Sequence, residues 1–126
     1  MMRVTSDLYA SALVRCIFTE GGFAAVSKRG APEAGAVFVL VDRLDGSFDF
    51  YGPAPQAMFT APVDGRLFEP LLSKADREQV DDRLGRESRI DPDYWVIEVE
   101  ARDGRIDLPL AEDEAPENPA DRYFKL

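Results

Sequence analysis

The hydrophobic and polar positions of this chain follow two periods, which predict a mixture of helices and strands. From Ser6 to the glycine pair 21–22, polar residues recur at a spacing of four, and apolar residues cover most of the remaining helical circumference. This pattern predicts a helix that Ser6 caps and the glycines end. A helix so rich in apolar residues is expected to be buried on more than one side, either deep against a sheet or in a dimer interface.

Several short segments show the composition and period of strands. The apolar run 36–41 predicts a central strand covered on both faces. Phe48 and Phe50 alternate with an outward Asp49, and the turn signal Asp45-Gly46 predicts a hairpin between these two segments. Further strands are predicted at residues 23–28, at residues 94–101 with Trp95, Ile97 and Val99 on one face, and, after a second turn signal at Asp103-Gly104, around Ile106, Leu108 and Leu110.

The segments between these strands complete the predicted architecture. Residues 52–56 form a rigid proline-containing loop, residues 57–72 are irregular, and a charged surface helix starts near Ser73 and runs over 74–89. We therefore predict an α+β fold, in the order α-β-β-β-α-β-β. It has a mostly antiparallel sheet of four to five strands, with one buried N-terminal helix and one surface helix. The first three strands are expected to be sequential and antiparallel. Residues 1–110 form one domain, and residues 111–126 form an acidic, proline-containing tail.

Composition narrows the chemistry that this chain supports. It has no histidine and one cysteine, Cys16, which excludes Ser-His-Asp catalysis and zinc sites built from thiolates and imidazoles. We therefore predict no catalytic residue, metal or cofactor. Cys16 is expected to be an inert core residue, and the absence of an internal disulfide favours the cytoplasm. The net charge of −9 makes nucleic acid and anionic membranes poor partners.

A resemblance to a known family emerges from the order of several short segments. They are residues 3–7 (RVTSD), 11–15 (SALVR), 21–24 (GGFA), 29–30 (RG), 34–36 (AGA), 51–56 (YGPAPQ) and 91–95 (DPDYW). In this order they resemble a family of short bacterial proteins described as domain of unknown function 1491. The resemblance covers residues 3 to 104 and implies a stand-alone small cytosolic protein. It implies no activity, cofactor or catalytic residue.

Two sets of polar residues are candidate binding sites. Asp7, Arg15, Arg29, Tyr51 and Gln56 would form a pocket for a small anion if the loops beside the central strands converge. The alternative is that they cap a helix, face solvent and satisfy loop backbone. The second set would bind a hard cation or simply form a solvated sheet face; it consists of Glu98, Glu100, Asp103 and Asp107.

These features favour a small cytosolic binding or accessory protein that acts through protein–protein contacts, with another protein or a second copy as its partner. The apolar first helix, the rigid loop beside Tyr51, an open edge strand and the acidic tail motivate this hypothesis. The alternative is a small-anion-binding protein or enzyme that uses the Arg/Tyr pocket. A third possibility is a basic partner held by charge alone.

Overall fold

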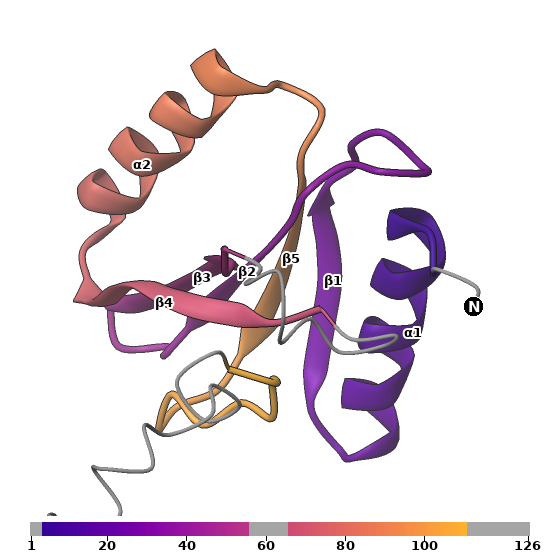
Figure 1. Ribbon diagram of the computed structural model, residues 1–126. Helices are drawn as coiled ribbons and strands as arrows, with labels where there is room; N and C mark the ends of the chain where they lie inside the picture. The colour runs from indigo at the N-terminus through magenta and orange to yellow at the C-terminus, as the bar shows by residue number, and fades with distance from the viewer. Residues whose placement is uncertain (1–3, 56–65, 111–126) are drawn as a thin grey trace, which may run out of the picture.

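A five-stranded sheet with a helix on each side forms the centre of the structure, a computed structural model that describes residues 4–55 and 66–110 (Figure 1). The predicted α+β class, with two helices and a mostly antiparallel sheet, is confirmed. The predicted tail, residues 111–126, lies outside the described residues. In chain order the elements are α1 (Ser6–Thr19), β1 (Phe23–Lys28), β2 (Val37–Asp42), β3 (Phe48–Pro53), β4 (Phe68–Ala75), α2 (Arg77–Ile90) and β5 (Trp95–Glu100).

The strands lie in the order β1-β5-β2-β3-β4, so the expectation of three sequential antiparallel strands is wrong. The chain crosses back through α2 and inserts β5 between β1 and β2, where it runs parallel to β2. The predicted hairpin of β2 and β3 is confirmed. Its turn contains Gly46 at φ +92°, and the Arg43 amide donates to the Ser47 carbonyl over 3.0 Å. A turn can be predicted from its own few residues, whereas the strand that lies beside another in the sheet depends on packing between segments far apart in the chain.

Residues 68–75, predicted to be irregular up to residue 72, form the edge strand β4. Its apolar positions do not alternate, because the pairing of β4 with β3 contains register shifts. The predicted strand after Asp103-Gly104 is absent from the described residues, where a single bridge joins Leu110 to Phe68. The chain order is therefore α-β-β-β-β-α-β.

Both faces of the central strands are buried, as the apolar run predicted. Val37, Val39 and Val41 lie in one core with Ala10 of α1, and this core also contains Trp95, Ile97 and Val99, the face predicted for β5. On the opposite face, a second core contains Phe38, Leu40, Phe48, Phe50, Val96 and Val80 of α2. The sheet thus separates two cores, each covered by one helix.

Helix α1 packs against β1 and β5, but only one of its sides is buried. Leu8 and Phe18 are 61% and 51% exposed, and Cys16 is exposed, so the expectation of a core cysteine is wrong. The helix also begins one residue earlier than predicted. Thr5 is the N-cap, and its hydroxyl accepts the Leu8 amide over 3.2 Å, while the buried Ser6 hydroxyl donates to the carbonyl of a loop glycine.

Helix α2 is the predicted surface helix, and Val80 is its buried side chain. Its N-cap is Asp76, not Ser73. The Asp76 carboxylate accepts the Gln79 amide over 2.8 Å, and the Gln79 side chain accepts the Asp76 amide over 3.0 Å. This reciprocal capping box fixes where β4 ends and α2 begins.

Candidate functional site

Two of the five predicted site residues, Asp7 and Arg29, lie together. Their side chains form an exposed ion pair with 3.5 Å between the nearest oxygen and nitrogen. The Arg29 guanidinium also lies 4.9 Å from the centre of the Trp95 ring, in a cation–π contact. Arg29 is therefore engaged by this chain's own residues.

The N-terminus of α1, beside this ion pair, has little capacity for an anion. The Ser6 amide donates to the Glu33 carbonyl over 3.2 Å, and the Asp7 amide donates to the Pro32 carbonyl over 2.8 Å. The N-cap hydroxyl accepts the next amide. These first-turn donors, which would bind an anion at an open helix end, are satisfied by the neighbouring loop and the cap.

The structure describes two of the other three residues of the set. Arg15 is exposed on α1, eight residues and about 12 Å along the helix axis from Asp7. Tyr51 packs against the core on the α1 side of the sheet. Gln56 lies outside the described residues. The five-residue pocket stays a prediction.

The second predicted set, the carboxylates near the end of β5, does not gather into a metal site. Glu98 and Glu100 share one strand face, and Asp103 accepts the Arg105 amide over 2.9 Å, which lowers the pKa of Asp103. Among residues 4–55 and 66–110, no three metal-ligating side chains are grouped.

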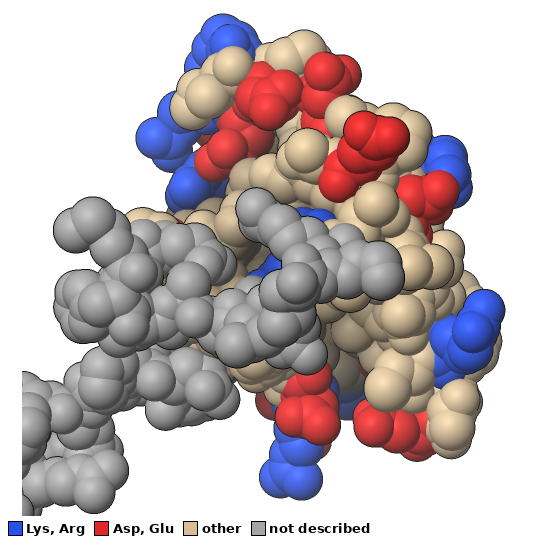
Figure 2. All heavy atoms as spheres, turned by 45° about the vertical axis from the view of Figure 1, so that its right-hand side comes forward, with Lys and Arg blue, Asp and Glu red and all other residues tan. Residues whose placement is uncertain are grey.

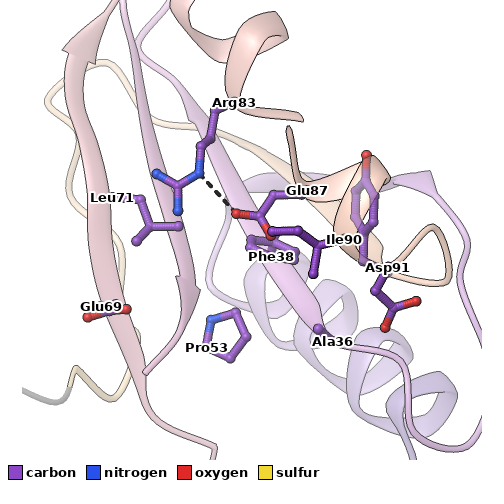
Figure 3. Close-up of a pocket in the computed structure, with 10 residues that line it drawn as sticks. Ala36, Phe38, Pro53, Glu69, Leu71, Arg83, Glu87, Ile90 and Asp91 are labelled. Carbon is purple, nitrogen blue, oxygen red and sulfur yellow. Dashed lines mark hydrogen bonds and ion pairs between the residues drawn. The ribbon is translucent and has the colours of Figure 1, made fainter. Parts of the chain in front are cut away.

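The strongest candidate site is a cleft between α2 and the sheet, which the sequence patterns did not single out (Figure 3). Its volume is about 300 Å³, the lower end of the usual range for ligand pockets, and it is open to solvent. Side chains from β2 and the residue before it, from β3, β4 and α2, and from the segment before β5 line it: Ala36, Phe38, Pro53, Glu69, Leu71, Arg83, Glu87, Ile90, Asp91 and Tyr94.

The cleft exists because α2 is anchored to the sheet near its start and diverges from it further along (Figure 1). Val80 is fully buried in the first turns, whereas Ile90 at the last residue is 79% exposed. The segment after the helix is held separately. The Lys28 ammonium donates to the carbonyls of Pro92 and Tyr94 over 2.7 and 2.9 Å and lies 4.1 Å from the centre of the Tyr94 ring. Helix α2 and the segment after it, which form one wall of the cleft, are therefore held at both ends.

The floor of the cleft is apolar and rigid. The Phe38 ring stacks on Phe50 with 5.4 Å between centroids and meets Tyr94 edge-on at 5.5 Å. Gly52 lets two of the lining side chains approach the backbone: a Cβ atom there would lie 2.7 Å from Leu71 Cδ1 and 2.8 Å from Phe38 Cε2. The floor is thus formed before any ligand arrives.

The rim of the cleft is charged. Arg83 and Glu87, one turn apart on α2, form an ion pair with Nε and Oε2 2.9 Å apart. Their side chains are 24% and 18% exposed, so the pair is largely covered. Glu69 on β4 and Asp91 after α2 lie at opposite ends of the view in Figure 3, with the ion pair between them. An apolar floor with a charged rim suits the binding of an amphipathic segment.

A buried ion pair ties β4, one wall of the cleft, to the rest of the sheet. Asp49, predicted to face outward into solvent, is 4% exposed, because the segment after β5 covers that face as well. Its Oδ2 atom accepts from Arg43 Nε at 3.0 Å and pairs with Arg43 Nη2 at 2.8 Å, and its Oδ1 atom accepts the Lys74 amide at 2.8 Å. The hydrogen bond to Asp49 raises the pKa of Arg43 above its usual value.

Sequence patterns missed this cleft for a physical reason. Phe38, Leu71 and Tyr94 have the hydrophobicity of core residues, and no period distinguishes a covered core residue from one that lines an opening. One signal was available: Ile90 is an isolated large apolar residue at the end of a charged helix, directly before Asp91-Pro92.

On the face that Figure 2 presents, acidic and basic side chains are interspersed, and several of opposite sign lie next to each other. In residues 4–55 and 66–110, no helix has both the length and the apolar character that a membrane span requires.

The chain is similar to one family and to several solved structures. The family described as "Protein of unknown function (DUF1491)" matches residues 4–108. The solution structure of a protein from A. tumefaciens is 41% identical, with a TM-score of 0.72, over 87% of this chain and all of that one. The crystal structure of a DUF1491 family protein from Caulobacter crescentus is 33% identical, with a TM-score of 0.67, over 86% of this chain and 98% of that one. No curated protein matches the chain.

Proposed function

Since this chain belongs to the DUF1491 family, whose description assigns no function, we propose a function from the geometry: it is a small bacterial accessory protein that holds a segment of a partner protein in the cleft between α2 and the sheet. The observation that carries this proposal is a rigid apolar floor, open to solvent, beside an isoleucine that is 79% exposed. Exposed apolar surface of this kind is typical of binding sites, and a preformed floor lowers the cost of binding.

The apolar sequence of α1 suggested that the outer face of this helix would bind a partner. The cleft is a better docking site than that face. The outward row of α1 consists of Ser11, Arg15 and Thr19, the polar residues spaced by four, which are all exposed. Leu8 and Phe18 are exposed on either side of this row rather than in one continuous stripe. A partner on α1 would have to cover polar groups in the middle of its interface.

The small-anion alternative has less support. Arg29, its central residue, is already paired with Asp7 and stacked on Trp95, and the nearby helix amides are satisfied. We therefore propose one function only. We also propose that the protein acts in the cytoplasm, because its single cysteine forms no internal disulfide.

The test compares two substitutions that place a carboxylate on opposite sides of the sheet. Tagged full-length chains carrying Ile90→Glu or Leu8→Glu are used to capture proteins from the native host's lysate, alongside the unmodified chain, and captured proteins are quantified by mass spectrometry. Both positions are highly exposed, so both variants should fold. Near-ultraviolet circular dichroism, which reports the environment of the buried Trp95 ring, checks this.

We expect Ile90→Glu to reduce capture of the partner at least about tenfold. Burial of an isoleucine side chain contributes about 1.5–3 kcal/mol, and about 1.4 kcal/mol corresponds to a factor of ten in affinity. Leu8→Glu should leave capture unchanged. Equal capture by the Ile90 variant and the unmodified chain would contradict the proposal. Loss of capture with Leu8→Glu alone would indicate that the partner binds α1.

A further inference from the structure

The charges around the cleft are unbalanced, and this restricts what it binds. Its lining contains three carboxylates, Glu69, Glu87 and Asp91, and one guanidinium, Arg83, which gives a formal charge of −2. Arg83 and Glu87 neutralise each other in their ion pair. Among the residues that line the cleft, the two remaining carboxylates therefore carry the unpaired charge.

These two carboxylates are placed at the ends of the apolar floor. Glu69 forms no ion pair with the described residues, and Asp91 Oδ1 accepts the Asp93 amide over 3.0 Å, a bond that leaves the carboxylate charge uncompensated. Glu69 comes from the edge strand β4 and Asp91 from the end of α2, with Phe38 and Leu71 between them (Figure 3). Along its length, the cleft therefore has a negative charge at one end, an apolar floor in the middle and a negative charge at the other end.

We propose that the segment bound in the cleft is a basic amphipathic peptide of a partner protein, in which lysine or arginine flanks apolar side chains. This inference rests on the proposed function. The apolar side chains would cover the floor formed by Phe38 and Leu71, while each basic side chain would meet one of the two carboxylates. An acidic segment would be repelled at both ends, and an uncharged segment would leave both carboxylates with less water and no partner.

The experiment selects peptides on the full-length protein and then removes the charges. A display library of random twelve-residue peptides is panned against the immobilised chain, and the enriched peptides are synthesised with a fluorophore. Their dissociation constants are measured by fluorescence polarisation at 0.05 and 0.5 M salt. The test variant carries Glu69→Gln and Asp91→Asn, and the matched control carries Glu20→Gln and Glu100→Gln, which remove the same charge outside the cleft. Ile90→Ser, which removes the apolar side chain without changing the charge, reports whether a peptide binds in the cleft.

The expected result has three parts. The enriched peptides carry lysine or arginine on both sides of apolar residues, and Ile90→Ser weakens their binding about tenfold or more. Removal of the two cleft carboxylates weakens binding about three- to tenfold at low salt, whereas the control variant binds as the unmodified chain does. The salt dependence of binding is smaller for the test variant than for the unmodified chain, because fewer charges contribute to its complex.

Other results would overturn the inference and indicate which step is at fault. Peptides that depend on Ile90 but lack basic residues, and bind the test variant unchanged, would overturn the charge assignment and leave the proposed function intact. Selection of no peptide that depends on Ile90 would overturn both. Basic peptides that bind only after Arg122→Glu and Lys125→Glu would assign the cleft to the chain's own C-terminal sequence, residues 122–126 (RYFKL), and overturn the proposal of an external partner.

Discussion

Replacement of Asp49 by alanine should destabilise the protein far more than any surface substitution. Asp49 is 4% exposed, and both of its carboxylate oxygens are used. The alanine variant leaves Arg43, whose side chain is 18% exposed, without its counter-charge, and it leaves the Lys74 amide without its acceptor. Because that amide belongs to β4, the substitution also loosens one wall of the cleft.

The expected magnitude follows from what is left unpaired. Breaking a buried ion pair by removing one partner costs about 3–5 kcal/mol, and a domain of this kind is stable by only about 5–15 kcal/mol. Asp49→Asn is the graded comparison. Its amide oxygen still accepts from Lys74, but its amide nitrogen, which is a donor, would replace the oxygen that accepts from Arg43. It therefore keeps the contact with β4, loses the charge and the acceptor for Arg43, and should cost about 1.5–3 kcal/mol.

Urea unfolding followed by tryptophan fluorescence measures both losses. The chain has a single tryptophan, Trp95, which is 1% exposed and therefore reports unfolding of the core. The free energy of unfolding falls by about 2 kcal/mol per molar urea, so Asp49→Ala should lower the urea midpoint by about 1.5–2.5 M. Asp81→Ala, which breaks the exposed ion pair with Arg77, is the control and should change stability by less than about 0.5 kcal/mol. A loss below about 1 kcal/mol for Asp49→Ala, or equal losses for both Asp49 variants, would refute the reasoning.

Three further predictions test other parts of the structure. Burial raises the pKa of Tyr9 above its usual value, against the opposing charge of an arginine. The folded chain therefore keeps this proton at a pH where the unfolded chain loses it, and the free energy of unfolding falls as pH rises above about 10. Tyr9→Phe should show a smaller decline in urea unfolding between pH 9 and 11, and an equal decline would argue against a buried phenol. Gly52→Ala should cost about 1–3 kcal/mol and move the Phe38 ring, because its Cβ atom would lie 2.8 Å from that ring; the unfolding midpoint and the aromatic NMR shifts check this. Thr5→Ala removes the cap of α1 and should cost about 1 kcal/mol in the same unfolding assay, whereas an unchanged midpoint would mean that the Leu8 amide finds another acceptor.

Much of the local structure could be predicted from the sequence because its causes are local. The apolar run at 36–41 identified β2 as a strand buried on both faces, and Asp45-Gly46 identified the hairpin after it. The limits of β1 were predicted to the residue, since a glycine pair precedes the segment and Arg29-Gly30 follows it. Local patterns failed at β4, where register shifts break the alternation on which strand prediction depends.

The candidate site could not be predicted in the same way. Of the polar set chosen from sequence, an ion pair is identified for Asp7 and Arg29, while Arg15 lies in solvent. Whether side chains from distant segments converge depends on which strands are neighbours, and β5 was inserted where a sequential arrangement would have placed β1 against β2.

The sequence by itself determined the fold class, the strand that is buried on both faces and the absence of histidine-based chemistry, because hydrophobic period is a property of short segments and composition is a property of the chain. Only the tertiary structure decided the strand order, the burial of Asp49 and the divergence of α2 from the sheet. Each of these depends on the balance of packing between segments far apart in the chain. The cleft is a consequence of that balance, since Val80 secures one end of α2 to the core while Ile90, ten residues later, stays in solvent.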